Sequence, residues 1–210
     1  MSDVRLKVCG ITSADDAATA VESGATYLGF NFYPPSPRYI APELARQIVD
    51  LLPEGVIPVG IFVNEPHPDD VNRIMECGGM RIAQLHGDED PEYCRAVGLQ
   101  RVIKAFRAAS GFQIRQAMEY SVDAVLLDAY DPRLYGGTGM TVDWGMAASL
   151  AREVRLFLAG GLSPDNIQEA IRAVHPWAVD LNSGVESAPG IKDATKLRLL
   201  RQRLDSTDDQ

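Results

Sequence analysis

Eight short runs of apolar and β-branched residues recur along the chain, and more polar stretches separate them. Runs of this length and composition are typical of buried strands, especially where glycine or proline bounds them. We therefore predict eight strands, at Arg5–Cys9, Tyr27–Asn31, Ile57–Val63, Arg81–Leu85, Arg101–Ala105, Ala124–Asp128, Arg155–Ala159 and Ala178–Leu181.

The stretches between these runs carry the start signals of helices. Ser13 is placed as an N-cap, and Ser163 is placed as another, with Pro164 as the first helical residue. We also expect a helix around Phe112–Tyr120 and a last helix from about Asp193 to Leu204. Prolines suit the first turn of a helix, and three further helices are expected at Pro42, Pro68 and Pro91.

Eight strands that each precede a helix predict a single α/β domain, a (β/α)8 TIM barrel. The 210 residues are near the small end for that fold. The alternative is an open doubly wound sheet, but Gly10-Ile11-Thr12 after the first strand is no dinucleotide fingerprint. We expect residues 1–204 to form the barrel and residues 205–210 to form a polar tail that frays.

Composition and charge narrow the classes of partner. The chain is 46% hydrophobic and 23% charged, which is ordinary for a globular protein. Its formal net charge of −9 argues against a nucleic-acid partner. No apolar run approaches the roughly 18 residues of a membrane span, and the N-terminus lacks the apolar core of a signal peptide. We expect a cytoplasmic protein without membrane or nucleic-acid partners.

The cysteines and histidines do not suggest a metal site. Each type occurs three times, scattered along the chain, and no C-x-x-C pair is present. An odd number of unpaired cysteines is also a poor disulfide framework and fits a reducing compartment. We therefore expect no structural disulfides and no metal.

Candidate chemical groups stand where the predicted strands end, which is where the active sites of such barrels lie. Lys7 and Cys9 are two apart, so they share one face of the first strand. If that face points inward, Lys7 needs a carboxylate partner, either Asp180 or Asp128, and its charge favours the Cys9 thiolate. The alternatives are Cys9 as a core-filling residue and Lys7 as a solvent-facing one.

Asp128 ends the sixth strand on the same face as Ala124 and Leu126. A carboxyl group above an apolar column has a raised pKa and can act as a general acid. Its alternative is an N-cap or turn residue. Gln84 and His86 end the fourth strand, and His86 either lines the mouth or caps the next helix.

Three glycine-containing loops can bring backbone N–H groups close to an anion. The first is Tyr135–Gly139, which includes Gly137 and Gly139. Gly160-Gly161 and Ser183-Gly184 follow strands seven and eight, where barrels often bind phosphate beside a short extra helix. Ordinary tight turns are the alternative.

Arg38 follows a proline-stiffened loop after the second strand. Its guanidinium can hold a substrate carboxylate through two hydrogen bonds. A surface salt bridge is the alternative.

Together these segments resemble the phosphoribosylanthranilate isomerases of tryptophan biosynthesis over nearly the whole chain. One departure is Asn182, where a serine often stands. The matching segments are Lys7–Thr12, Gly29–Ile40, Val59–Asn64, Gln84–Gly87, Leu126–Asp128, Tyr135–Gly139, Asp143–Trp144, Ala159–Leu162 and Asp180–Glu186.

The resemblance implies an Amadori rearrangement of N-(5-phosphoribosyl)anthranilate. It implies Asp128 as the general acid, Cys9 as the general base and Arg38 as the ligand of the anthranilate carboxylate. No cofactor is expected, because the protonated Schiff base is itself an electron sink. We expect a monomer, with a dimer as the alternative. The expected substrate-binding residues are Lys7, Arg38, Gln84, His86, Gly137, Gly139, Gly160, Gly161, Asp180, Ser183 and Gly184.

Two rival functions use similar parts. The histidine-pathway aminoaldose isomerase runs the same rearrangement on a barrel with two aspartates, whereas the first strand here ends in Cys9. A non-catalytic phosphosugar-binding barrel would keep the glycine loops but would need neither Cys9 nor Asp128.

Overall fold

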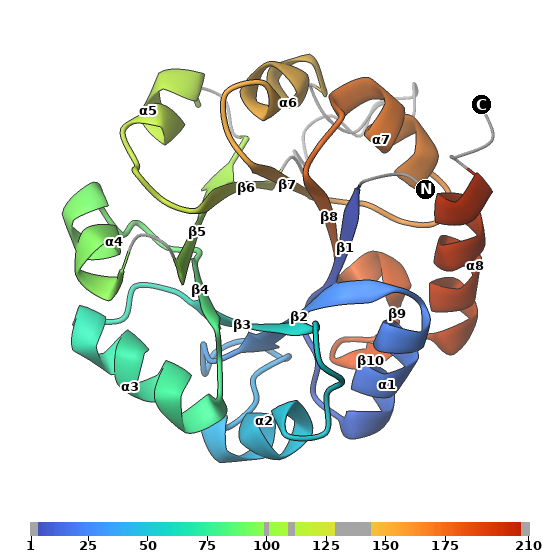
Figure 1. Ribbon diagram of the computed structural model, residues 1–210, viewed down its shortest axis with the longest axis horizontal. Coiled ribbons are helices and arrows are strands. Elements are labelled where there is room, and N and C mark those ends of the chain that lie inside the picture. The colour runs from blue at the N-terminus through green and yellow to red at the C-terminus, as the bar shows by residue number, and fades with distance from the viewer. Residues whose placement is uncertain (1–3, 99–100, 109–111, 129–143, 207–210) are drawn as a thin grey trace.

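The chain forms a closed barrel of eight parallel strands (Figure 1). The computed structural model describes residues 4–98, 101–108, 112–128 and 144–206. Each strand pairs with the next in sequence, and β8 pairs with β1 to close the ring. The helices lie outside this ring, so the predicted TIM barrel is confirmed.

The elements alternate along the chain as predicted. The barrel strands are β1 (Arg5–Val8), β2 (Ala25–Asn31), β3 (Ile57–Phe62), β4 (Ile82–Leu85), β5 (Val102–Arg107), β6 (Ala124–Asp128), β7 (Leu156–Ala159) and β8 (Ala178–Leu181). The helices are α1 (Ala14–Glu22), α2 (Pro42–Val49), α3 (Pro68–Gly78), α4 (Pro91–Val97), α5 (Ile114–Met118), α6 (Trp144–Ala151), α7 (Ile167–Val174) and α8 (Ala194–Asp205).

Most of the predicted helix starts are confirmed. The Ser13 hydroxyl accepts a hydrogen bond from the Asp16 amide at 3.1 Å, and prolines open α2, α3 and α4. The predicted start of α7 is wrong, because this helix begins at Ile167. Before it lies a turn in which the Asn166 side chain accepts from the Ser163 amide at 2.9 Å. That local hydrogen bond favours a turn over a helix at these residues.

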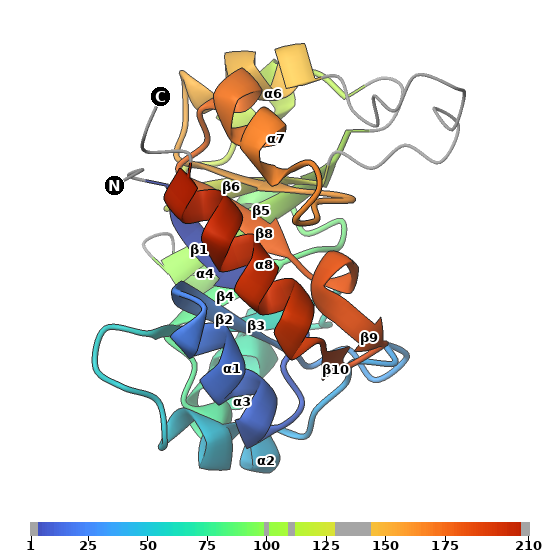
Figure 2. The same cartoon turned by 90° about the vertical axis from the view of Figure 1, so that its right-hand side faces the viewer.

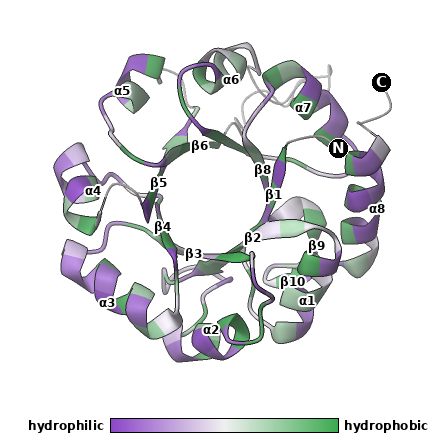
Figure 3. Ribbon diagram, viewed as in Figure 1, coloured by the Kyte–Doolittle hydropathy of each residue, from purple (hydrophilic) through white to green (hydrophobic). Residues whose placement is uncertain are grey.

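The apolar core has two parts, one inside the barrel and one between the strands and the helices. Along β6, Ala124 and Leu126 belong to the inner part, and Val125 and Leu127 belong to the outer part. Asp128 continues the inward row at the end of the strand, as its spacing predicts. Figure 3 shows the helices with many hydrophilic positions on their outer sides.

Of the segment between β8 and α8, only a short helix was predicted. The 3₁₀ turn η3 (Ser183–Val185) supplies the short extra helix expected there. A two-stranded hairpin of β9 (Glu186–Ala188) and β10 (Ile191–Lys192) follows it and leads into α8 (Figure 2). No helix among the described residues has the length and apolarity needed to cross a membrane.

Candidate active site

A cavity of about 510 Å³ opens at the C-terminal ends of the barrel strands. Lys7 lies just outside its lining, and Gly137 and Gly139 lie outside the described residues. The other predicted site residues all line this one cavity, namely Cys9, Arg38, Gln84, His86, Asp128, Gly160, Gly161, Asp180, Ser183 and Gly184.

Lys7 is fully buried and forms an ion pair with Asp180 on the neighbouring strand β8, with 2.8 Å between Nζ and Oδ2. Asp180 is therefore the partner, out of the two carboxylates that the sequence offered. Burial lowers the pKa of Lys7, but the carboxylate outweighs it and the pKa is raised, so the amine stays protonated. The other oxygen, Asp180 Oδ1, is buried without a hydrogen-bond partner among the described residues.

Cys9 is buried directly after β1 and borders the cavity. Burial raises the pKa of its thiol, and the positive charges of Lys7 and Lys192 oppose that shift. The charge of Lys7 favours the thiolate, as expected, but it is not the largest influence on Cys9. Loss of hydration, with the negative charge of Asp180, outweighs both cations and raises the pKa, so Cys9 is a thiol at neutral pH.

Gln84 and His86 form a fixed pair on one wall. Gln84 is 2% exposed, and its Nε2 lies 3.1 Å from His86 Nδ1. Burial lowers the pKa of His86, with the Asp128 carboxylate opposing, so the ring is neutral at neutral pH. An amide nitrogen can only donate, so Nδ1 is the acceptor and Nε2 carries the proton. Asp90, rather than His86, caps the next helix.

Asp128 is half-buried at the end of β6, where it borders the same cavity as Cys9. Its charge acts on His86 and on Asp180. As a cap or turn residue, the alternative, Asp128 would contact the loop after β6, and that loop lies outside the described residues.

Arg38 reaches the cavity from the loop after β2, with 19% of its side chain exposed. Its Nε and Nη2 atoms donate to the Glu186 carboxylate, at 2.9 Å from Nε to Oε1 and 2.6 Å from Nη2 to Oε2. The salt-bridge alternative is therefore present, but as a largely buried pair rather than a surface one. The edge of the guanidinium that contains Nε is occupied, so a substrate carboxylate has to approach the Nη1 side.

The loops after β7 and β8 pack tightly against each other beside the cavity. A Cβ atom on Gly184 would overlap the carbonyl oxygen of Leu162. Only glycine fits at that approach, which brings Ser183 of η3 and the pair Gly160-Gly161 to one end of the cavity.

Sequence reasoning missed part of this site. Asn31 and Asn182 line the cavity, and Lys192 Nζ donates a hydrogen bond to Asn182 Oδ1. Asn31 could have been found, because it is a polar residue at the end of a predicted strand. Lys192 gave no such signal, since the hairpin that carries it was not predicted.

Comparisons with known proteins show the family of the chain. The family model of N-(5'phosphoribosyl)anthranilate (PRA) isomerase matches residues 6–203. An N-(5'-phosphoribosyl)anthranilate isomerase from Trichlorobacter lovleyi is 53% identical over 196 residues, which are 93% of this chain and 95% of the relative. The chain belongs to this family.

Solved structures of the family share the fold. A phosphoribosyl anthranilate isomerase from Thermus thermophilus aligns with a TM-score of 0.86 at 44% identity, covering 97% of this chain and 99% of the relative. Another, in complex with reduced 1-(o-carboxyphenylamino)-1-deoxyribulose 5-phosphate, aligns with a TM-score of 0.83 at 39% identity, with the same coverage. The chain is therefore an enzyme, an isomerase of tryptophan biosynthesis, and the two rival functions are set aside.

Proposed function

We propose that Cys9 and Asp128 carry the rearrangement of N-(5-phosphoribosyl)anthranilate to 1-(2-carboxyphenylamino)-1-deoxyribulose 5-phosphate. The observation behind this assignment is that a thiol and a carboxyl group from β1 and β6 border one cavity of about 510 Å³. The reaction needs two proton-transfer groups around one sugar and no change in oxidation state of the protein.

The protonated form of Asp128 donates its proton to the furanose ring oxygen, and the ring opens to a Schiff base. The thiolate form of Cys9 then removes the proton from ribose C2, giving an enolamine that tautomerises to the aminoketose. Because the pKa of Cys9 is raised by burial, its thiolate is scarce but is a stronger base when formed. Lys7 and Lys192 partly offset the cost of forming it.

The rest of the cavity holds the two ends of the substrate and the sugar between them. The loops of Gly160-Gly161 and Ser183-Gly184 bind the phosphate, and Arg38 binds the anthranilate carboxylate. Gln84 Oε1 and Asp180 Oδ1 are buried acceptors without partners among the described residues. Ribose hydroxyl groups can donate to both, which relieves the cost of leaving them unpaired.

The test is the loss of substrate fluorescence on rearrangement, measured for wild type, Cys9→Ala and Asp128→Asn. We expect each variant to lower kcat by about 10²–10⁴-fold, the usual contribution of a positioned acid or base. Affinity for inorganic phosphate should stay within about twofold, because neither residue belongs to the phosphate loops. Cys77→Ala, on an exposed cysteine, is the matched control and should turn over normally. Near-normal turnover of Cys9→Ala or Asp128→Asn removes that residue from its role.

We also propose that the enzyme works as a cytoplasmic monomer without a nucleic-acid partner. A solved structure from Thermotoga maritima is described as monomers generated from a dimeric phosphoribosylanthranilate isomerase. Size-exclusion chromatography with light scattering decides between the monomer and the dimer alternative.

A further inference from the structure

We propose that Glu186 is a positioning residue for Arg38, and that Lys192 holds Glu186 from the opposite side. In this arrangement the guanidinium is fixed with its free edge toward the cavity before the substrate binds. The inference rests on the proposed function, because it takes the anthranilate carboxylate as the ligand of Arg38.

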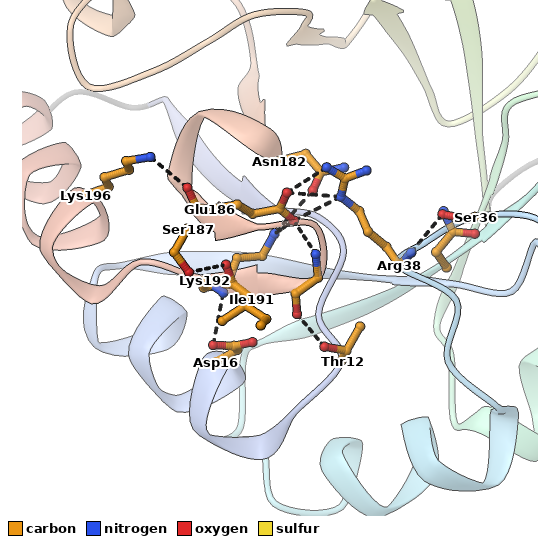
Figure 4. A network of polar contacts seen from close by, with 12 residues as sticks. Thr12, Asp16, Ser36, Arg38, Asn182, Glu186, Ser187, Ile191, Lys192 and Lys196 are labelled. Atoms are coloured by element: carbon orange, nitrogen blue, oxygen red, sulfur yellow. Dashed lines mark hydrogen bonds and ion pairs between the residues drawn. The ribbon is translucent and has the colours of Figure 1, made fainter.

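The contacts of the Glu186 carboxylate carry the proposal (Figure 4). The side chain is 4% exposed, and its two oxygens accept from Arg38 Nε at 2.9 and 3.2 Å and from Nη2 at 2.6 Å. Oε1 also accepts from Lys192 Nζ at 2.8 Å and from the Gly190 amide at 3.2 Å. A carboxylate held at both oxygens by charged donors leaves the guanidinium little rotational freedom.

Lys192 is itself held in place. Its side chain is 1% exposed, and Nζ donates to Asn182 Oδ1 at 3.2 Å as well as to Glu186. Its backbone amide donates to the Asp16 carboxylate at 3.2 Å, which ties the hairpin to α1. Lys192 therefore connects Glu186, which orients Arg38, with Asn182 in the wall of the cavity.

The stem of Arg38 is restrained independently of Glu186. A Cβ atom on Gly10 would lie 2.8 Å from Arg38 Cδ and 2.8 Å from Asn182 Oδ1, so the side chain crosses directly over this glycine. With its stem packed and its Nε edge bound, Arg38 can present only the Nη1 side to a ligand.

The charges in this cluster suit an anionic ligand. Two cations, Arg38 and Lys192, share the single Glu186 carboxylate. Burial raises the pKa of Glu186, but the hydrogen bonds from Arg38 and Lys192 outweigh it and lower the pKa, so this carboxylate is ionised at neutral pH. One positive charge is left over, and a substrate carboxylate at Nη1 would balance it.

A purely structural role for Glu186 makes a different prediction. Its carboxylate also accepts from the Gly190 amide at 3.2 Å and from Lys192 Nζ at 2.8 Å, and so holds the turn of the hairpin that follows η3. If Glu186 only stabilised this turn, its loss would loosen the phosphate end of the cavity. Binding of phosphate and of carboxylate would then weaken together.

The experiment measures the dissociation constants of two probes, anthranilate and inorganic phosphate, for wild type, Glu186→Gln and Arg38→Ala. We expect Glu186→Gln to weaken anthranilate binding about tenfold, as for loss of a charged hydrogen bond, and to leave phosphate within about twofold. KM should rise with a smaller change in kcat. The double variant Arg38→Ala/Glu186→Gln should bind anthranilate no more weakly than Arg38→Ala alone, because Glu186 acts through Arg38.

Ser187→Ala, on the exposed neighbour of Glu186, is the matched control and should leave both constants unchanged. If Glu186→Gln does not fold, Glu186→Asp keeps the charge but shortens the side chain, and it should show the same selective loss of anthranilate. Parallel loss of both probes, unchanged anthranilate binding in a folded variant, or additive effects in the double variant would each overturn the inference. Failure of wild type to rearrange the substrate would instead contradict the proposed function.

Discussion

The buried pairs Lys104–Glu89 and Lys7–Asp180 differ in how completely their hydrogen bonds are made. Lys104 and Glu89 are each 2% exposed in their side chains, with 2.9 Å between Nζ and Oε2. Nζ also donates to the carbonyl oxygens of Gly87 at 2.7 Å and Leu85 at 3.3 Å. The ammonium group thus has three acceptors for its three protons.

The carboxylate of this pair is equally saturated. Glu89 accepts from the backbone amides of Asn64 at 2.8 Å and Gly87 at 2.9 Å, in addition to Lys104. In the other pair, Asp180 binds Lys7 with one oxygen, and its second oxygen is buried without a partner among the described residues.

Burial of charge alone therefore does not identify the reactive part of this site. The saturated pair of Lys104 and Glu89 ties together the loops after β3 and β4 and strand β5, so its task is structural. In the unsaturated pair, Asp180 lines the cavity together with Cys9, and Lys7 lies outside the lining. Unused hydrogen-bonding capacity, rather than charge, distinguishes a group that awaits a ligand.

The largest effect should come from breaking the saturated pair. Lys104→Met leaves Glu89 buried without its cation, so we expect the free energy of unfolding to fall by about 3–5 kcal/mol. The folded fraction should keep kcat within a few-fold of wild type at low temperature, because Lys104 has no proposed contact with the substrate. Urea unfolding and the fluorescence assay measure the two quantities.

The matched control for that variant is Arg46→Met. Arg46 and Asp50 form an ion pair whose side chains are 52% and 57% exposed, so the expected loss is at most about 0.5 kcal/mol. A loss of kcat in Lys104→Met that is as large as in Cys9→Ala would contradict the division into structural and reactive pairs.

An intermediate effect should appear in the pH dependence of Cys9 alkylation by iodoacetamide. Only the thiolate reacts, and burial raises the pKa of Cys9 above its usual 9.0. The rate should therefore rise about tenfold per pH unit from pH 7 to pH 9 without a plateau. Peptide mass spectrometry in a Cys77→Ser background follows the Cys9 peptide separately from that of the buried Cys94.

Lys7 should accelerate that alkylation, since its charge lowers the pKa of Cys9. We expect slower modification in Lys7→Met at each pH where the variant is folded. A plateau below pH 9 in the parent protein would show that the cations outweigh burial.

The smallest effect should come from Gln84→Met, which removes one unpartnered acceptor and keeps the shape of the side chain. KM should rise several-fold if Gln84 Oε1 accepts from the substrate, and the free energy of unfolding should fall by at most about 1 kcal/mol, for the lost bond to His86. Gln202→Met, on the exposed side of α8, is the control. A large loss of stability with unchanged KM would make Gln84 a structural residue.

The sequence predicted the barrel because the apolar runs and helix start signals agree from end to end. It also predicted Asp180 as one of two partners for Lys7. This prediction was possible because the first and last strands of a closed barrel are neighbours. Lys7 and Asp180 lie opposite each other in the register of these two strands.

Other parts could not be predicted, because they depend on distances and burial that a sequence does not contain. Arg38 and Glu186 are 148 positions apart and meet through a hairpin without a strong local signal. The pKa of Cys9 is raised by burial and by Asp180 and lowered by Lys7 and Lys192, and the direction of the net shift cannot be decided without coordinates. Asp180 supplied an expected partner, but its unpaired oxygen became visible only in the structure.

The pairing of β1 with β8 has a consequence for how the protein is made. Lys7 is synthesised 173 residues before Asp180, and Glu186 and Lys192 follow Asp180 in the chain. Until then Lys7 has no counter-charge, and the first strand has no neighbour on one side. A nascent chain that has not yet reached Asp180 lacks this counter-charge and the hairpin of β9 and β10, so catalytic competence is acquired only after β8 and the hairpin have been made.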